Sequence, residues 1–500
     1  MQNGTLLAAL DLGSNSFRLE IGRLDHGQIR RTEYLKEVVR QGNGLDEARN
    51  LSRDAMQRGL DCLARFAERL AGIPRTQARA VATQTLREAR NRDEFLSRGH
   101  EILGFRIDVI SGREEARLIY QGVSRLLPQS DERRLVIDIG GRSTEMILGQ
   151  GYEARLMESF RVGSVSWSMR YFPKGEFTPD AFRMAKIAAE AVLDEALQAY
   201  DRSHWSAAYG ASGTVGAVAD MLAAAGGPPG LITREGLDWL RERLLKARTV
   251  ERVNIDGMKD DRKLVIGGGL SVLLAIFDLL GIRELQAADG ALRHGVLYDL
   301  VERDAADSDV RSASVRRLAA KFDTDAAQAS RVATVATQFF SQLQASLNRP
   351  QEETSRLQRK LLWAAQLHEI GFLVSHSSYH RHGAYVLDNA DAPGFALPEL
   401  HRLSQLVLGH RGKLKKLEAE LADPAFAQQL LALRLAVILC HARRDPDVEG
   451  LKLGGKPRQA QRTLGCRPGW AEAFPQSVHL LREEAAAWAK TPWPLQLQGF

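Results

Sequence analysis

The sequence has few cysteines and no long apolar segment. Its three cysteines, Cys62, Cys440 and Cys466, are widely separated and odd in number, which excludes a disulfide framework and a cysteine-rich zinc site. The longest strongly apolar stretch without charge, residues 264–277, contains three glycines and is shorter than the ~20 residues that a membrane-spanning helix needs. The N-terminus lacks the basic start and the long apolar core of a signal peptide. These absences predict a cytoplasmic protein without an integral membrane segment.

The composition is that of an ordinary globular protein. Hydrophobic residues account for 44% of the 500 positions, aromatic residues for 7% and charged residues for 26%, which excludes a disordered chain, a fibrous repeat and a membrane bundle. At ~150 residues per domain, this length predicts about three domains. The net charge of +6 is a mild surplus that favours an anionic partner.

An internal repeat organises the N-terminal part of the chain. Residues 8–22 and 135–149 each contain an apolar run with an aspartate at its end, a turn rich in glycine, serine or asparagine, and a second alternating run. At a constant offset Asp11 meets Asp138 and Gly13 meets Gly140. Each segment has the pattern of a β-hairpin followed by helical stretches. The chain is therefore predicted to contain two similar α/β halves with a cleft between them, the alternative being two hairpins that share a turn by chance.

The pattern changes near Val310. Long helical runs are predicted at 312–322, 325–347, 352–372, 398–421 and 424–443, and after Pro446 the chain becomes richer in glycine and proline. We therefore predict two α/β domains over 1–124 and 125–305, a helical domain over 306–445, and a small C-terminal module over 446–500. The acidic and serine-containing stretch Glu302–Ser308 is the expected linker before the helices.

The two glycine-rich turns are candidate phosphate-binding loops. Backbone N–H groups of such turns converge on an anion because no Cβ blocks the approach. Asp11, Asp138 and Glu145 would repel phosphate unless a cation lies between, which indicates Mg²⁺. One such loop is common, but two in register, each with an aspartate at the strand end, make a more specific signal. The candidate phosphate-binding residues of the two turns are Ser14, Asn15, Ser16, Arg18, Gly140, Gly141, Ser143 and Thr144.

Further segments combine a predicted strand with a polar turn. Residues 210–214 follow a strand and 267–270 open an apolar helix, so both place free amides where anions are favoured; close packing explains the second turn equally well. Arg87 follows another strand, where it is placed to bind phosphate, with an ordinary surface position as the alternative. Glu114 and Glu115 begin a predicted helix, and paired acids at that position usually interact with the helix dipole.

The paired loops occur together with three further motifs. These are Gly-Ala-Ser-Gly-Thr at 210–214, Ser-Gly-x-Glu-Glu-Ala-Arg-Leu-Ile at 111–119, and Asp-Gly-Ala-Leu-Arg-x-Gly-Val-Leu at 289–297. In this combination, and over nearly its whole length, the chain resembles the exopolyphosphatase/guanosine pentaphosphate phosphatase family. The resemblance implies an α/β fold with two actin, sugar kinase and Hsp70-like (ribonuclease H-like) domains, followed by an all-α HD-like domain and the small C-terminal module.

The resemblance also implies roles for single residues. Glu115 would be the general base, which replaces the helix-dipole interpretation of that residue. Asp138 and Glu145, with Asp11 as an additional candidate, would hold Mg²⁺; Mn²⁺ is an alternative, and a monovalent cation such as K⁺ is a further candidate. Arg142 stands where the family usually has a third glycine, and it either adds a phosphate contact or folds away from the site. The implied phosphate contacts are Asn15, Arg87, Ser143, Ser212, Gly213 and Thr214, and Gly210 is a further candidate in the same turn.

The helical region contains many histidines but an incomplete metal motif. The family's third domain resembles the HD phosphohydrolases, whose metal site needs an upstream His, a His-Asp pair and a later Asp. Here Glu369 follows His368, and no histidine occurs between His294 and His368. Since His368 continues the apolar stripe of Leu361 and Ala365, we interpret it as a core histidine rather than a metal ligand.

These patterns predict an exopolyphosphatase that releases terminal phosphate from inorganic polyphosphate, with Glu115 activating water. The alternative is a guanosine pentaphosphate (pppGpp) 5′-phosphatase; a sugar kinase-like enzyme, a chaperone-like ATPase and a non-catalytic polyphosphate binder are more distant. A basic run with Arg411, Lys413 and Lys415 is predicted to extend the polyphosphate site, the alternative being a solvated helix face. No nucleic-acid partner is expected, and a homodimer is a further candidate assembly.

Overall fold

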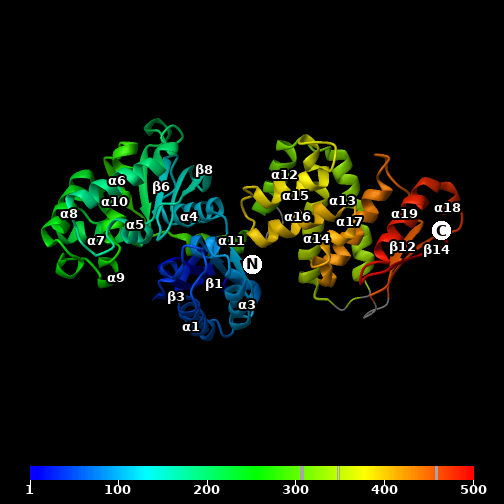
Figure 1. Cartoon of the computed structure of the whole chain (residues 1–500), viewed down its shortest axis with the longest axis horizontal. Coiled ribbons are helices and arrows are strands. Elements are labelled where there is room, and N and C mark those ends of the chain that lie inside the picture. The colour runs from blue at the N-terminus through cyan, green and yellow to red at the C-terminus, as the bar shows by residue number, and fades with distance from the viewer. Residues whose placement is uncertain (304–308, 346, 348, 456–459) are drawn as a thin grey trace. The chain divides into compact units, whose positions relative to one another are not determined.

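The computed structural model describes residues 1–303, 309–345, 347, 349–455 and 460–500. The chain forms two compact units, Met1–Asp309 and Val310–Phe500. Figure 1 shows strands and helices together in the first unit, whereas the second is mainly helical. Within the described part of the chain, every helix is too short or too polar to span a lipid bilayer.

The first sheet of the first unit has the strand order β3-β2-β1-β4-β5. β1 pairs antiparallel with β2 and parallel with β4. The apolar run of β1 is buried along nearly its whole length, as expected for a central strand that is covered on both faces. The strands are β1 (Leu6–Leu12), β2 (Ser16–Asp25), β3 (Gln28–Val38), β4 (Ala78–Ala82) and β5 (Ile107–Val109).

The second sheet repeats this arrangement. Its order is β10-β11-β9-β6-β7-β8, and apart from β10 at the edge, its order and strand directions match those of the first sheet. This match confirms the predicted pair of α/β halves. The strands are β6 (Arg133–Ile139), β7 (Thr144–Gln150), β8 (Glu153–Phe160), β9 (Ala207–Ala211), β10 (Leu231–Thr233) and β11 (Glu284–Ala287).

Helices α4 and α11 join the two sheets. Their backbones approach closely, because a Cβ on Gly295 of α11 would lie 1.8 Å from the carbonyl oxygen of Leu118 in α4. Both helices share one apolar core with β1, β4, β6 and β7. The start of α4, capped by the hydroxyl of Ser111, is thereby held at the junction of the two halves.

The helices of the first unit are α1 (Arg53–Arg69), α2 (Gln84–Glu88), α3 (Arg92–Leu103), α4 (Gly112–Leu126), α5 (Ser164–Tyr171), α6 (Pro179–Leu193), α7 (Ser212–Ala224), α8 (Arg234–Ala247), α9 (Asp260–Lys263), α10 (Ile266–Leu280) and α11 (Leu292–Arg303). The glycines at 267–269 lie inside α10, where a Cβ on Gly268 would be 2.4 Å from the backbone nitrogen of Ser168 in α5. Close helix packing therefore explains these glycines, and they do not form a phosphate loop.

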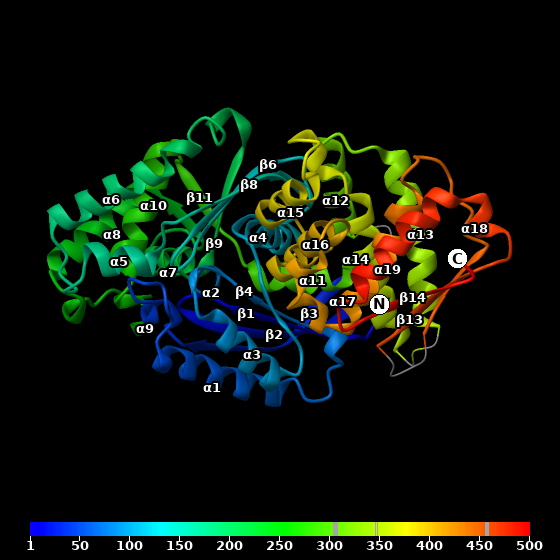
Figure 2. The same cartoon turned by 45° about the vertical axis from the view of Figure 1, so that its right-hand side comes forward.

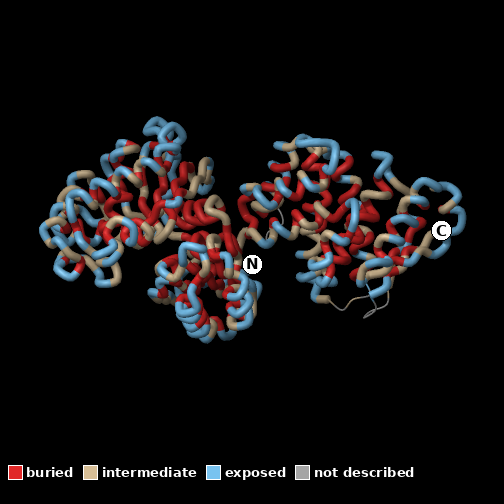
Figure 3. Tube along the Cα trace, in the orientation of Figure 1, coloured by how far each residue is buried: buried red, intermediate tan, exposed pale blue. Residues whose placement is uncertain are grey.

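The second unit is a helical bundle with a small sheet of order β12-β13-β14. α13 packs against both α14 and α17, as Figures 1 and 2 show, and the buried segments lie inside the bundle (Figure 3). One apolar core extends from Val315 to Leu495 and includes Leu451, Leu464 and Trp470, so residues 446–455 and 460–500 pack on the helices. α15 lies outside the predicted helical runs. The elements are α12 (Val310–Lys321), α13 (Ala326–Gln344), α14 (Gln351–Gln366), α15 (Tyr379–Asn389), α16 (Leu397–Gly409), α17 (Pro424–Leu439), α18 (Trp470–Ala473), α19 (Pro475–Trp488), β12 (Leu451–Gly454), β13 (Arg462–Cys466) and β14 (Leu495–Gln498).

Candidate active site

The turns of the two hairpins face each other in the first unit. A Cβ on Gly141 of the second turn would lie 3.1 Å from the Cβ of Ser14 in the first, so the two turns are in van der Waals contact. They border a cavity of about 430 Å³. The structure thus brings most of the predicted site residues together, and those that line the cavity are Asp11, Ser14, Asn15, Ser16, Arg18, Glu115, Asp138, Gly140, Gly141, Ser143, Ser212, Gly213 and Thr214.

Glu115 projects from the first turn of α4 into this cavity. Its side chain is nearly buried, and its Oε2 accepts a hydrogen bond from Nη1 of Arg87 at 3.2 Å. Burial raises the pKa of Glu115 to about 7; Arg87 opposes this rise, and the charges of Asp11 and Asp138 add to it. A carboxylate whose pKa is near neutral suits general base catalysis.

The neighbouring Glu114 has a different environment. Its carboxylate accepts two hydrogen bonds from Arg117, from Nε and from Nη2, each at 2.8 Å. Arg117 also donates to Asp299 of α11 at 2.5 Å. Glu114 is fully buried and does not line the cavity. The two acids therefore point to different surroundings. Glu114 belongs to the packing of α4 on α11, whereas Glu115 faces the cavity.

A second group of carboxylates lies on the second hairpin. Asp138 and Glu145 are directly opposite each other in the β6–β7 ladder, so their side chains share one face of the sheet. Oε1 of Glu145 accepts a hydrogen bond from Oγ of Ser159 at 2.7 Å. Burial raises the pKa of Asp138 to about 7 although Arg18 opposes the rise, and burial together with the charges of Glu115 and Asp138 raises the pKa of Glu145.

Three predicted phosphate contacts of the first unit, Thr144, Gly210 and Arg87, do not line the cavity. Thr144 is the first residue of β7, and its side chain points to the face opposite to that of Glu145 because successive strand residues alternate. Its hydroxyl donates to the carbonyl of Val162 at 2.6 Å. Gly210 is buried in β9, where a Cβ would lie 2.6 Å from Val215. Thr144 and Gly210 are therefore corrected to structural positions. Glu145, a predicted metal ligand, also lies outside the lining of the cavity, although it is the cross-strand partner of Asp138; Arg87 reaches the cavity only through its hydrogen bond to Glu115.

Ser212 begins α7 in a strained conformation. Its φ of 95° is in the left-handed region, which costs a non-glycine residue about 1–3 kcal/mol and persists where the surroundings fix it. Its hydroxyl accepts hydrogen bonds from the backbone N–H groups of Thr214 and Val215, at 3.2 and 3.3 Å. This geometry holds the glycine-containing turn at the cavity, next to Gly213.

Several cationic residues of the cavity were not predicted. Lys36, Lys259, Arg262 and Arg293 line it, and the guanidinium of Arg262 packs so closely that a Cβ on Gly213 would be 2.1 Å from its Nη2. Arg293 belongs to the motif at 289–297 and could have been found from it. Lys36 on β3 and Arg262 on α9 belong to no recognisable sequence motif. They could not be predicted, because only the fold brings these distant segments together.

Arg142 folds away from the cavity. Its Nη1 donates to the carbonyl of Gly42 at 3.2 Å, and its Nη2 donates to Oε2 of Glu88 at 3.1 Å. It is absent from the residues that line the cavity. Of the two alternatives for this position, the structure supports the one without a phosphate contact.

Two histidines of the second unit, His368 and His410, are core residues. His368 is almost fully buried and its Nδ1 bonds the carbonyl of Ala365 at 2.7 Å; His410 bonds the carbonyl of Val407 in the same way. Burial lowers the pKa of His368 to about 4, so the ring is neutral. In residues 310–345, 347, 349–455 and 460–500 no three His, Cys, Asp or Glu side chains are grouped closely enough to hold a metal ion.

The basic run of the second unit is a surface segment. The guanidinium of Arg411 lies over the ring of Tyr379, 4.9 Å from its centroid, while Lys413 and Lys415 are exposed on either side of the buried Leu414. This arrangement matches a solvated surface held by buried leucines.

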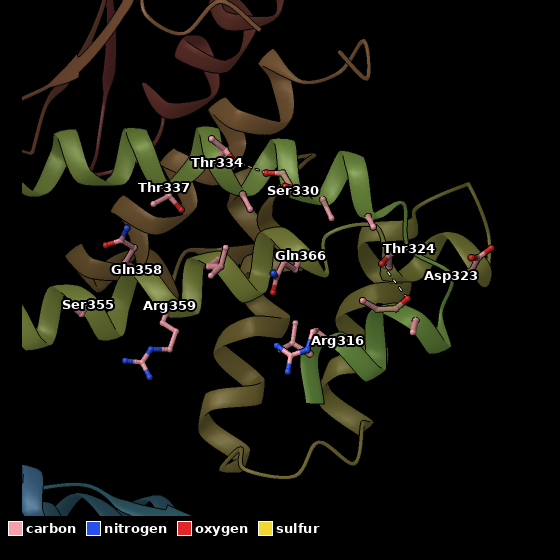
Figure 4. A pocket seen from close by; sticks show the side chains of 17 residues that line it. Arg316, Asp323, Thr324, Ser330, Thr334, Thr337, Ser355, Gln358, Arg359 and Gln366 are labelled. Atoms are coloured by element: carbon pink, nitrogen blue, oxygen red, sulfur yellow. Dashed lines mark hydrogen bonds between the residues drawn. The ribbon is translucent and has the colours of Figure 1, made fainter. Parts of the chain in front are cut away.

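The second unit also contains a larger cavity, of about 880 Å³, between α12, α13 and α14. Figure 4 shows hydroxyl and amide side chains of α13 and α14 along it, with Arg316, Asp323 and Arg359 at its margins. Among the described residues that line it, one carboxylate and no glycine-rich turn occur, so it lacks the groups that phosphoryl transfer needs. The chemistry therefore belongs to the smaller cavity in the first unit.

Comparison with known proteins identifies the family and the fold. The model of the Ppx/GppA phosphatase family matches residues 21–304, and that of Ppx/GppA phosphatase, domain III matches residues 310–482. A crystal structure of an exopolyphosphatase-like protein is 26% identical, covering 60% of this chain and 98% of its own, with a TM-score of 0.55. An exopolyphosphatase from Cytophaga hutchinsonii is 25% identical, covering 59% and 98%, with a TM-score of 0.54. The predicted actin-like fold is thereby confirmed.

Relatives that match nearly the whole chain bear another name. Proteins of Vibrio cholerae serotype O1, Vibrio atlanticus and Photobacterium profundum are 39%, 38% and 37% identical, and each alignment covers 99% of this chain and 98% of the relative. All three are named guanosine-5′-triphosphate,3′-diphosphate pyrophosphatase. The prediction of an exopolyphosphatase is therefore wrong, since the two structures named above match only 59–60% of the chain at 25–26% identity. The basic run thereby loses its assignment as a polyphosphate channel.

Proposed function

We propose that this chain, which belongs to the Ppx/GppA phosphatase family, removes the terminal 5′-phosphate of guanosine 5′-triphosphate 3′-diphosphate. The observation that carries the proposal is the position of Glu115, a buried carboxylate in a cavity bordered by two phosphate-binding turns. The names of the full-length relatives support the choice of substrate.

The turns and the cations of the cavity would bind the substrate. Backbone N–H groups at Gly13, Gly141 and Gly213 suit the terminal phosphate, because glycine leaves room for close approach. The cations on the rest of the lining suit a ligand with many negative charges at both ends of the nucleoside. These cations are Arg18, Lys36, Lys259, Arg262 and Arg293.

Hydrolysis would proceed by direct attack of water. The Glu115 carboxylate takes a proton from the water as its oxygen forms a bond to the terminal phosphorus in line with the leaving oxygen. The phosphoanhydride bond breaks, and the products are orthophosphate and guanosine 5′-diphosphate 3′-diphosphate. The loop amides stabilise charge on the transferring phosphoryl group.

A divalent cation fits the second hairpin. Asp138 lines the cavity, Glu145 lies opposite it in the ladder, and burial disfavours the charged form of both. Mg²⁺ is usually bound by one or two carboxylates together with substrate phosphates, which suits a site without a larger cluster of protein ligands among the described residues. We propose that Asp138, supported by Glu145, holds Mg²⁺; when bound, the ion supplies neutralisation of phosphate charge.

The cysteines favour a reducing compartment. Cys62, Cys440 and Cys466 are free thiols, and secreted proteins of this kind usually carry paired cysteines. We therefore place the enzyme in the cytoplasm.

Phosphate release by the full-length chain tests the proposed function. Guanosine 5′-triphosphate 3′-diphosphate, GTP and long-chain polyphosphate are supplied separately with Mg²⁺. The pentaphosphate is expected to be the best substrate, and Glu115→Gln is expected to lower its hydrolysis by about 10²–10⁴-fold while nucleotide binding persists. Glu153→Gln, on an exposed residue of β8, is the matched control. A Glu115→Gln enzyme with wild-type rate, or a chain inactive on the pentaphosphate, overturns the proposal.

A further inference from the structure

Helix α2 carries a chain of hydrogen bonds that ends on Glu115. Arg87 donates to Oε2 of Glu115 at 3.2 Å and to the carbonyl of Ile110 at 2.7 Å, both from Nη1. Oε1 of Gln84 accepts from Nε of Arg87 at 3.0 Å, and Nε2 of Gln84 donates to Oε1 of Glu88 at 2.6 Å. The amide of Gln84 is therefore fixed from both sides, and it in turn fixes the guanidinium that holds Glu115.

Arg142 completes this chain from the other half of the unit. It comes from the turn of the second hairpin, and its Nη2 reaches Oε2 of Glu88 at 3.1 Å while its Nη1 holds the carbonyl of Gly42. The side chains of Arg142 and Glu88 are 22% and 15% exposed, so solvent screens this ion pair less than a fully exposed one. Neither side chain lines the cavity, which separates their role from binding of substrate.

We propose that Arg142 is a positioning residue for Glu115, acting through the side chains of α2. It neutralises Glu88 and orients its carboxylate, so that this carboxylate holds Gln84 and does not compete for Arg87. A general base has to lie within hydrogen-bond reach of the water that it deprotonates, and a displacement of about 1 Å can lower the rate by up to 10²-fold. The proposal rests on Glu115 as the base of the proposed function. It gives a role to the residue that replaces a glycine in the second turn.

A double-mutant cycle at the two ends of the ion pair tests this role. Arg142→Gly and Glu88→Gln are each expected to lower kcat for the guanosine pentaphosphate about tenfold, while KM changes less than about twofold. The double variant is expected to lose no more than either single variant, because both act through one chain. A loss of about 100-fold in the double variant, or a change confined to KM, overturns the proposal.

Arg234→Ala is the matched control for a broken ion pair. Arg234 pairs with Asp238 at 2.5 Å and with Asp278 at 2.7 Å in the same unit, and its side chain is 30% exposed against 22% for Arg142. Its kcat is expected to equal that of the wild type; an equal loss in this control shows a general effect of destabilisation and overturns the proposal. Should Arg142→Gly not fold, Arg142→Lys replaces it, because lysine keeps the charge but cannot donate to Gly42 and Glu88 with a rigid fork. A loss of about threefold in kcat is then expected, and wild-type kcat overturns the role.

The two proposals fail in different ways. A Glu115→Gln enzyme that remains active removes the general base and with it the proposed mechanism. An inactive Glu115→Gln enzyme together with wild-type kcat in Arg142→Gly overturns only the role of Arg142.

Discussion

The two hairpins of the first unit have the same backbone but opposite electrostatics. In the first, Asp11 is directly opposite Arg18 in the β1–β2 ladder, and the two side chains form an ion pair at 2.9 Å. In the second, Asp138 occupies the place of Asp11, but Glu145 is its cross-strand partner. One scaffold therefore carries a neutralised aspartate in the first hairpin and two facing acids in the second, of which Asp138 lines the cavity.

In the proposed function, this difference gives the two hairpins different roles in binding a phosphate chain. Opposite charges across a strand pair stabilise each other, whereas like charges directly opposite are destabilising. In the first hairpin, Arg18 already balances the charge of Asp11 in the free protein, so its turn can accept an anion. The second is incomplete until protons or a cation neutralise Asp138 and Glu145, which is why burial raises the pKa of both.

The largest expected effect is on the metal requirement of the second hairpin. Asp138→Asn removes the carboxylate proposed to hold Mg²⁺, and we expect hydrolysis at a fixed low Mg²⁺ concentration to fall about 100-fold. The Mg²⁺ concentration for half-maximal rate should rise, which a titration of rate against Mg²⁺ measures.

Asp11→Asn is the matched variant on the first hairpin. Since Arg18 already neutralises Asp11, the half-saturating Mg²⁺ concentration should remain that of the wild type. An equal shift in both variants would show that the two hairpins share the metal and would contradict the division of work.

The next effect is on pH dependence. Glu115 must be ionised to accept a proton, and its pKa is about 7 because of burial. We expect kcat to fall about tenfold per pH unit below the pKa of this group in the enzyme–substrate complex, as a pH profile at saturating substrate and Mg²⁺ shows. Arg87→Met should move this limb to higher pH, because Arg87 opposes the rise in the pKa of Glu115. If the acidic limb of the pH profile of kcat is unchanged in Arg87→Met, the ionisation that produces it belongs to a group other than Glu115.

The fold and much of the site were predictable because the signals are local. The hairpin repeat, the glycine turns and the Ser111 cap are each encoded within a few residues. The distinction between Glu114 and Glu115 was not local, since it depends on Arg117 and Asp299 of α11. The direction of Thr144 follows from strand alternation once the start of β7 is known, but the turn in the sequence leaves that start open by one residue.

Other parts of the site depend on long-range packing. Lys36 meets Asp261 only because the two halves close on one cavity. Arg262 meets Gly213 through packing of distant segments within the second half. Whereas these residues were missed, the basic run at 411–415 was overinterpreted. Its charge pattern alone gave no information on where it lies in the fold. Substrate preference is also beyond pattern analysis here. The two turns proposed to bind phosphate are common to both kinds of enzyme in the family that the sequence resembles.

A smaller effect is expected when the first hairpin is made to resemble the second. Arg18→Met removes the partner of Asp11 and also a charge that lowers the pKa of Asp138. The cavity then gains net negative charge, so Mg²⁺ in the absence of nucleotide should bind about threefold more tightly, which isothermal titration calorimetry measures. The matched variant Arg234→Ala should bind Mg²⁺ as the wild type does. Weaker Mg²⁺ binding in Arg18→Met would show that Arg18 supports the metal rather than only Asp11.

The smallest effect concerns stability in the absence of metal. Glu115 and Asp138 have pKa values of about 7 in the folded protein, each raised by burial, against about 4 in an unfolded chain. Between these values the folded state binds more protons than the unfolded state, so the free energy of unfolding falls as pH rises from about 4.5 to 7. We expect Tm of the metal-free first unit, followed within the full chain by calorimetry, to fall by about 5 °C over this range. Mg²⁺ should remove most of this fall by neutralising the second hairpin, and Glu145→Gln should reduce it without Mg²⁺ because one of the opposed acids is gone. A pH slope that is unchanged both by Mg²⁺ and in Glu145→Gln would show that these carboxylates are not the groups that destabilise the empty site.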